Sequence, residues 1–200
     1  PPAVLLDRVA GMADRLEGLL AELKALEIIY EKGLLPEPAY VFKHAVIQDV
    51  AYNSLLRERR RELHRAVAFA LEEIYPDRLA EHYEELAHHF SQGEEWAKAF
   101  AYLVRSGDRA KDASANATAL DWYARALDAA SRATPPISRL RLAEVHQRRG
   151  QILAAVARLD EARAEARKML EYARAEGDRR LEAEAQTELA YSHYMTLSWD

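Results

Sequence analysis

The sequence contains no cysteine among its 200 residues and only seven glycines and seven prolines. The absence of cysteine excludes disulfides, thiolate metal sites and a cysteine nucleophile, and it suits a cytoplasmic protein. No apolar run approaches the roughly 20 residues that a membrane span needs. A net charge of −5 also lacks the basic surplus of most proteins that bind nucleic acids or anionic membranes. We therefore expect neither a membrane nor a nucleic acid as a partner.

The few glycines never form a phosphate-binding loop. Neither G-x-x-x-x-G-K-[ST] nor G-x-G-x-x-G occurs in the sequence. We therefore predict that this chain has no ATP or dinucleotide site of its own, needs no cofactor and is not an enzyme.

Half of the residues are hydrophobic, and Ala, Leu, Glu and Arg dominate the composition, which is typical of a mainly α-helical protein. The pattern predicts a winged-helix-like domain over residues 1–75, followed by an α-α superhelix of helical hairpins over residues 76–200. The elements expected in the first domain come in the order of a winged helix: a helix at 4–10, a helix from Met12, strands at 27–31 and 39–42 around a wing tip at 32–38, and a helix at 45–75 bent near Arg57.

Small residues recur twelve positions apart beyond Pro76. The pairs are Ala87 with Ala99, Gly107 with Ala119, and Gly150 with Ala162, and Ala190 opens a further repeat whose second helix would start near Trp199. Two antiparallel helices approach closely only where both present a small side chain, so each pair predicts a hairpin crossing. The pattern resembles the tetratricopeptide repeat, Leu-Gly-x-x-Tyr followed by Ala-x-x-x-Phe. The uneven repeat intervals predict one long helix at about 94–113, and the unfinished last repeat leads us to expect that the native protein continues.

An arginine-rich run marks the middle of the predicted 45–75 helix. Glutamates alternate with the arginines, which is typical of a mixed-charge solvated face. A contact with another domain or a partner is the second interpretation, and DNA contact is the third. The candidate contact residues are Arg57, Arg59, Arg60 and Arg61.

Three potential metal ligands, His82, Glu85 and His89, could share one helical face. A zinc enzyme would also need an open coordination position and further partners that orient the ligands. Packing and surface positions explain the same residues more simply, so we predict no metal site.

His44 follows the second predicted strand and opens a helix, where backbone N–H groups favour an anion. Such a histidine either bonds locally or contacts a phosphate that another domain supplies.

The segments FKHAVIQDVAY, beginning at Phe42, and RRRELH, beginning at Arg59, resemble the region after the ATPase core in signal-transduction ATPases with numerous domains. The similarity is greatest to the bacterial branch in which a class III adenylate or guanylate cyclase precedes the ATPase and tetratricopeptide repeats follow. In that family the core ends in a winged helix, matching residues 1–75, and the repeats match 76–200. Related members carry a Met-His-Asp motif whose histidine senses the β-phosphate of ADP. The triplet here is Lys43-His44-Ala45, so the histidine alone matches.

The resemblance implies a non-catalytic regulatory and protein-interaction module of a larger protein. Its parent would be a cyclase with an ATPase domain that uses ATP or ADP and Mg²⁺. The expected partners are that ATPase domain and a protein or peptide on the repeats. One alternative is a transcription regulator of the same ATPase class. Direct DNA binding is less favoured, because the predicted recognition helix offers only Arg15 and Lys24 as bases against three acidic residues.

Overall fold

A computed structural model describes residues 2–10, 13–33 and 39–197 and shows a mainly α-helical protein, as predicted. The chain divides into two compact units, Pro1–Glu95 and Trp96–Asp200. The sequence pattern predicts this boundary twenty residues earlier, after Tyr75. The first unit extends further because helix α4 packs against the 3₁₀ helix η1 and helix α5, which follow it. None of the described helices is both long and apolar enough to cross a membrane.

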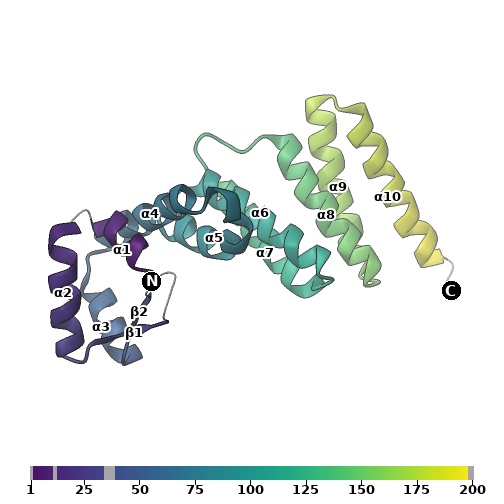
Figure 1. The fold of residues 1–200 in the computed structure, drawn as a ribbon. Helices are drawn as coiled ribbons and strands as arrows, with labels where there is room; N and C mark the ends of the chain where they lie inside the picture. The colour runs from purple at the N-terminus through teal and green to yellow at the C-terminus, as the bar shows by residue number, and fades with distance from the viewer. Residues whose placement is uncertain (1, 11–12, 34–38, 198–200) are drawn as a thin grey trace. The chain divides into compact units, whose positions relative to one another are not determined.

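The first unit begins with the predicted order of helix, strand, strand and helix (Figure 1). Its elements are α1 (Ala3–Ala10), α2 (Ala13–Ala25), β1 (Ile29–Lys32), β2 (Ala39–Phe42) and α3 (Ala45–Ser54). The strands are antiparallel, and their register runs from Ile29 opposite Phe42 to Lys32 opposite Ala39. Most of the expected wing tip, residues 34–38, lies outside the described residues. The assignment of this segment as a winged helix stays a prediction.

The prediction of a single bent helix over residues 45–75 is wrong. The structure has two helices, α3 and α4 (Arg57–Ile74), separated by extended backbone at Leu55 and Leu56. The Leu55 N–H donates to Tyr52 O, three residues back, and the Ser54 hydroxyl donates to Ala51 O, so the helical hydrogen-bond ladder ends there.

The first unit ends with a helical hairpin. Pro76 opens the 3₁₀ helix η1 (Pro76–His82) rather than an α-helix, and α5 (Tyr83–Gln92) follows. The side chains of Leu71 on α4 and of Leu86, Ala87 and Phe90 on α5 are buried. The ring of Phe90 also meets Phe69 of α4 edge-on, with 5.3 Å between centroids. This hairpin is the main core of the first unit.

In the described part of the second unit, up to Leu197, five helices follow one another, and neighbours along the chain pack together (Figure 1). They are α6 (Trp96–Asp112), α7 (Asn116–Arg132), α8 (Arg139–Ala155), α9 (Leu159–Glu176) and α10 (Arg179–Leu197). The long helix expected at about 94–113 corresponds to α6. The expected break at Thr134–Pro136 falls between α7 and α8.

Glycines lie at two of the contacts between these helices. A Cβ atom added to Gly107 of α6 would lie 2.5 Å from Cε1 of Tyr123 on α7. The Tyr123 hydroxyl in turn donates to Asp108 of α6 at 2.6 Å. At Gly150 of α8 an added Cβ would lie 3.7 Å from the carbonyl oxygen of Ala162 on α9. Only a residue without a side chain at position 107 lets the Tyr123 ring lie this close to α6.

The other predicted packing residues differ in burial. Ala87, Ala99 and Ala119 are fully buried and Ala162 nearly so, but Ala87 and Ala99 belong to different units. Ala190 is exposed on α10, so the packing role expected for it is not seen. That role required a second helix near Trp199, which lies outside the described residues.

The same turn closes α5, α6 and α8. The second residue after each of these helices has left-handed backbone: Glu94 (φ 58°), Ser114 (φ 59°) and Ala157 (φ 60°). The next N–H then donates back to a carbonyl of the preceding helix: Glu95 to Phe90, Ala115 to Ala110 and Arg158 to Leu153, at 2.9, 2.9 and 2.8 Å. These bonds are those of the Schellman motif, which satisfies carbonyls that a helix end would leave unpaired. Gly177 (φ 71°) closes α9 in the same way.

Candidate functional site

A groove of about 410 Å³ lies in the second unit, among α8, α9 and α10. Helices α8 and α9 contribute small side chains to its lining, including Gly150, Ala154 and Ala162. Helix α10 contributes Glu188 and Tyr191, and the Tyr191 side chain is exposed. The groove is therefore mostly apolar and combines room for a side chain with one carboxylate and one aromatic ring, a composition common in ligand sites.

Glu188 is the charged group of this groove. Burial raises the pKa of its carboxyl, the neighbouring Glu184 carboxylate raises it further, and a hydrogen bond with Gln151 opposes the rise. In the described part of the chain no Lys or Arg forms an ion pair with it. A half-buried carboxylate without a cation favours a ligand that brings one.

A polar network holds the helices behind the groove. Glu165 of α9 accepts from His146 Nδ1 at 2.6 Å and from Arg149 Nε at 2.8 Å, both on α8. Burial alone would raise the pKa of Glu165, but these two hydrogen bonds and the electrostatic attraction of Arg149 and His146 together outweigh it and hold the pKa below its usual range. Arg149 also donates to the carbonyl of Leu120 on α7 at 3.2 Å. The Arg149 charge is therefore committed to Glu165 and leaves Glu188 without a basic partner.

His44 occupies the position expected for it, between β2 and α3. It is the N-cap residue of α3, its side chain makes no capping hydrogen bond, and it is exposed. Its carbonyl accepts from the N–H groups of Ile47 and Gln48 at 3.1 and 3.3 Å. Helix α3 itself has no buried residue. The imidazole is therefore open to solvent, and within this chain it interacts electrostatically with the Glu27 carboxylate.

The arginines at the start of α4 mainly contact side chains of their own unit. Arg57 and Arg61 both pair with Glu94, in the turn after α5, at 3.2 and 2.9 Å. Arg59 pairs with Glu62 at 2.9 Å, and the guanidinium of Arg60 lies over the Tyr52 ring at 5.1 Å.

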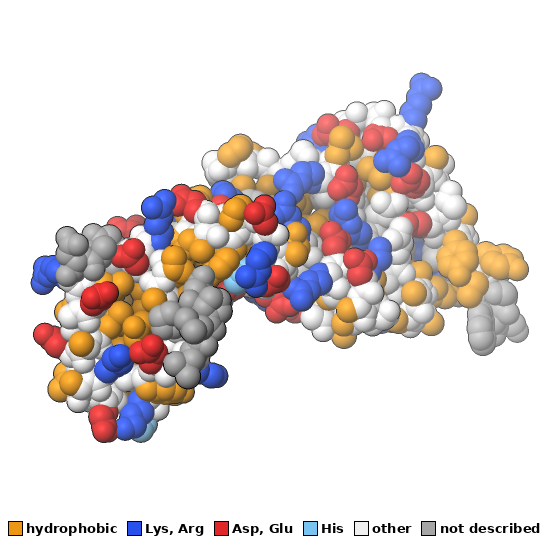
Figure 2. Space-filling view, viewed as in Figure 1, with side chains coloured by type: hydrophobic (Ala, Val, Ile, Leu, Met, Phe, Trp, Pro, Cys, Tyr) orange, Lys and Arg blue, Asp and Glu red, His pale blue; other side chains and the backbone are white. Residues whose placement is uncertain are grey.

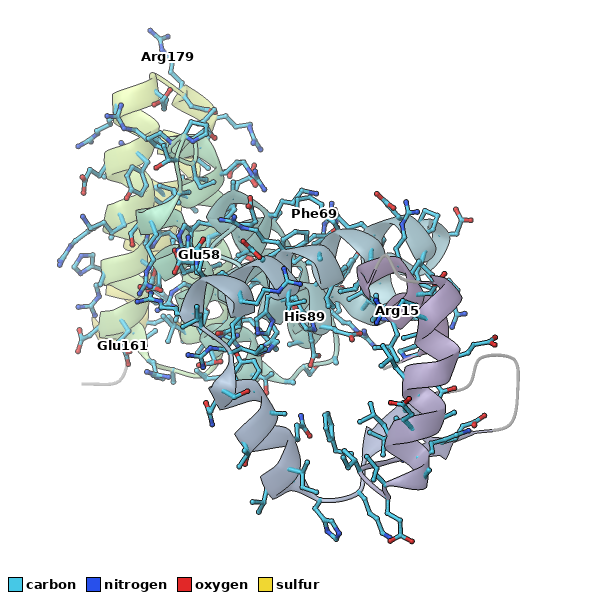
Figure 3. The ribbon with its side chains drawn as sticks, turned by 90° about the vertical axis from the view of Figure 1, so that its left-hand side faces the viewer. Arg15, Glu58, Phe69, His89, Glu161 and Arg179 are labelled. Atoms are coloured by element: carbon cyan, nitrogen blue, oxygen red, sulfur yellow. The ribbon has the colours of Figure 1, made fainter. Side chains whose placement is uncertain are left out.

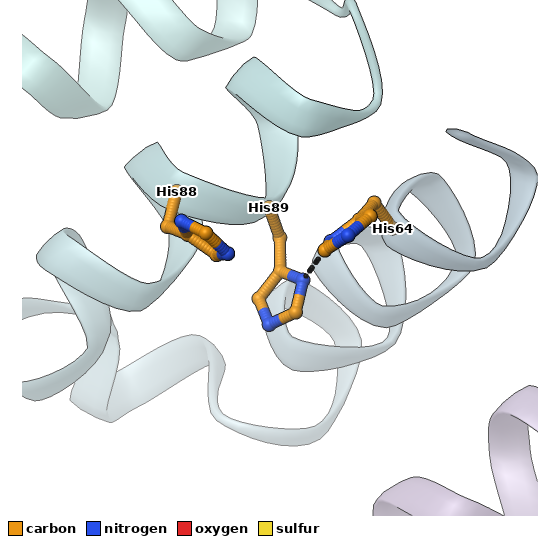
Figure 4. Close-up of side chains that lie close together, drawn as sticks. All are labelled: His64, His88 and His89. Carbon is orange, nitrogen blue, oxygen red and sulfur yellow. Dashed lines mark hydrogen bonds between the residues drawn. The ribbon is translucent and has the colours of Figure 1, made fainter. Parts of the chain in front are cut away.

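A cluster of three histidines links α4 to α5 (Figure 4). His64, His88 and His89 each place one ring nitrogen within 4.8 Å of the others. Burial lowers the pKa of His89 to about 4, with smaller contributions from His64 and His88, and it lowers the pKa of His64 as well. We refer to these residues as the histidine cluster.

The structure does not assemble the metal set considered from the sequence. His82 instead pairs with Glu85 at 3.2 Å and stacks on Tyr75, with 4.5 Å between ring centroids. His89 joins His64, which is 25 residues earlier in the chain. No local spacing signals that partnership. A prediction that α4 and α5 form an antiparallel pair would have been needed to find it.

Comparison with known proteins identifies no family for this chain. No family model matches it, and no curated protein matches it. Among solved structures it is similar to the crystal structure of BtubC (BKLC) from P. vanneervenii, with 14% identity, 97% of this chain and 92% of that chain covered, and a TM-score of 0.32. A similarity at this level supports no functional argument.

Proposed function

We propose that this chain is a non-catalytic, cytoplasmic regulatory and protein-interaction module of a multidomain nucleotide-regulated signalling protein, a cyclase-linked ATPase. In this proposal the second unit binds a peptide segment of a partner, and the first unit contacts the nucleotide-binding domain of the same polypeptide. ATP or ADP and Mg²⁺ would belong to that domain.

The observation that carries the proposal is the groove around Glu188. Its volume of about 410 Å³ suits one or two side chains rather than a large cofactor. Small residues, Gly150, Ala154 and Ala162, form part of its lining and present little side chain to a ligand. The exposed Tyr191 ring supplies apolar area at the rim, as anchoring aromatics do at many protein interfaces.

The charge of the groove selects the peptide. Burial disfavours the ionised form of Glu188. A Lys or Arg side chain that enters beside the carboxylate would stabilise this form, because its charge and hydrogen bonds replace the lost hydration. We therefore expect the peptide to carry one basic residue next to a small or medium apolar residue.

Selection from a displayed library of random peptides, with this chain as bait, tests the preference. Enrichment of a basic residue beside an apolar one supports the proposal, and selected peptides should bind Glu188→Gln at least about tenfold more weakly. Glu182→Gln is the matched control, because Glu182 lies on the same helix, pairs with Arg174 at 2.8 Å and does not line the groove. Selected peptides without a basic residue would contradict the assignment of Glu188.

Helix α3 supports contact with another domain. Val46, Val50 and the following Leu56 are 71%, 64% and 79% exposed. His44 lies at the N-terminal end of the same helix, where backbone N–H groups favour an anion such as a nucleotide phosphate. We expect His44→Ala to raise the basal output of the parent protein. Unchanged basal output together with unchanged ADP retention would remove His44 from the mechanism.

Two alternatives remain as proposals of lower rank. A transcription regulator of the same ATPase class would use both units in the same way and differ only in its output domain. Direct DNA binding by α2 is less supported, because Lys24 pairs with Glu31 of β1 at 3.0 Å and Arg15 is left as the other base (Figure 3). A gel shift at low salt distinguishes this alternative, since phosphate contacts are strongest there.

A further inference from the structure

We propose that His64, His88 and His89 bind one divalent transition-metal ion, with Zn²⁺ as the expected occupant. The site would join α4 to α5 and is independent of the groove on the second unit. Figure 4 shows the three rings facing one another across a small space.

The ring separations match those of a three-histidine metal site. The centroids of His64 and His89, His88 and His89, and His64 and His88 lie 5.0, 5.2 and 5.5 Å apart. In a tetrahedral zinc site each zinc–nitrogen bond is about 2.0–2.1 Å long, and the ring centroid lies about 1.1 Å beyond the nitrogen. The centroids of two imidazole ligands are then about 5.2 Å apart. The three ring centroids therefore already form a nearly equilateral triangle of the required size, and the ligating nitrogens, which lie within 4.8 Å of one another, would have to turn inward to a separation of about 3.3 Å.

Two of the nitrogens already point at one another. His64 Nδ1 and His89 Nδ1 lie 2.8 Å apart and share one proton in a hydrogen bond. Around a tetrahedral zinc ion two such nitrogens lie about 3.3 Å apart, so they need to separate by only about half an ångström. A metal ion would lie between these two nitrogens once the proton has moved from Nδ1 to Nε2 of His89, which leaves both imidazoles neutral and both Nδ1 lone pairs free to ligate.

The other nitrogen of His64 has a fixed partner, which is a second and independent observation. His64 Nε2 lies 3.0 Å from the hydroxyl oxygen of Tyr52 on α3. When Nε2–H donates to that oxygen, the lone pair of His64 is left on Nδ1, facing the cluster. Metal-binding histidines generally have such a partner, because it sets the tautomer and the ring orientation.

The donor set defines the class of ion. Three imidazoles without a carboxylate suit Zn²⁺ and its neighbours Cu²⁺, Ni²⁺ and Co²⁺, and do not suit Mg²⁺ or Ca²⁺. The His88 side chain is exposed, which gives the ion a path to the site and leaves room for water as a fourth ligand. The guanidinium of Arg60 lies nearby, over the Tyr52 ring, and its positive charge repels a divalent cation. We therefore expect this site to bind Zn²⁺ more weakly than structural zinc fingers do.

Calorimetric titration of the untagged, chelator-treated chain with ZnCl₂ tests the proposal. We expect one Zn²⁺ per chain, a higher midpoint of thermal unfolding, reversal by EDTA and no response to MgCl₂. Co²⁺ should give the visible absorption bands of a tetrahedral, nitrogen-ligated ion.

Variants separate a metal site from a packed aromatic cluster. His88→Ala should keep the helical circular dichroism, because His88 is exposed, but should weaken Zn²⁺ binding at least about tenfold. Tyr52→Phe should weaken it by about tenfold through the loss of the orienting hydroxyl. His193→Ala, at an exposed histidine of α10, is the control and should bind as the unmodified chain does. Equal Zn²⁺ affinity in His88→Ala and the unmodified chain, or no saturable binding in the micromolar range by the latter, overturns the proposal.

Discussion

The segment up to Leu56 and the second unit differ in how they shield apolar side chains from water. Among the described residues before α4, the buried hydrophobic side chains are Leu5, Leu20 and Ile29. The second unit instead buries residues along every helix, with small residues where the helices cross. Local pairing of helices is therefore sufficient to build the second unit, whereas the first segment leaves apolar surface that a neighbouring domain would cover.

Glycine substitutions test this contrast with the largest expected effect. Gly107→Ala should destabilise the second unit by about 1–3 kcal/mol, because its Cβ would overlap the Tyr123 ring. Gly18→Ala is the matched control in α2, where nothing lies within 4 Å of an added Cβ, and should stabilise by about 0.5–1 kcal/mol.

Urea unfolding followed by tryptophan fluorescence measures the first change, since Trp96, Trp122 and Trp199 all belong to the second unit. Circular dichroism measures the second. Equal effects of the two substitutions would show that the helices do not approach as closely at Gly107 as the structure indicates.

A substitution in a helix-ending turn should have the next largest effect. Ala157→Gly should stabilise the second unit by about 1 kcal/mol, because left-handed backbone disfavours a side chain. Ala124→Gly, at an exposed position inside α7, should destabilise by about the same amount. Tryptophan fluorescence reports both, and a loss of stability in Ala157→Gly would contradict the turn geometry.

The smallest effect is expected on α3. Val46→Ser and Val50→Ser should each change the free energy of unfolding by less than about 0.5 kcal/mol, since both side chains are exposed and Val and Ser have similar helix propensity. Leu71→Ala, in the hairpin core, should cost about 2–5 kcal/mol in the same circular dichroism experiment. Losses above about 1 kcal/mol at Val46 or Val50 would mean that α3 packs within this chain.

Elements with a clear periodic signal could be predicted from the sequence. Helix α6 and both strands lie within two residues of their expected bounds, because helical and alternating patterns report local structure directly. The break between α3 and α4 could not be predicted, because Leu55 and Leu56 both fit the helical pattern. Only the backbone of the structure shows that the helical hydrogen bonds stop there.

The candidate sites were harder to predict. His44 could be placed at a helix start from its neighbours alone. Glu188 and His64 could not be singled out, because each matters through contacts with another helix. The groove needs α8 beside α10, and the histidine cluster needs α4 against α5, so neither follows from spacing within one helix.

Whether Glu188 makes the groove a site for a basic peptide can be measured by titration. The affinity of a selected lysine-containing peptide is determined from pH 4 to pH 8 for the unmodified chain and for Glu188→Gln. The free Glu188 carboxyl has a raised pKa, and a bound lysine favours its ionised form. Binding therefore releases a proton, so affinity should rise with pH through that pKa and then level off. Glu188→Gln should bind at least about tenfold more weakly at pH 7 and show no such rise. Equal affinities and identical pH profiles for the two proteins would contradict the assignment of the groove as a site for a basic peptide.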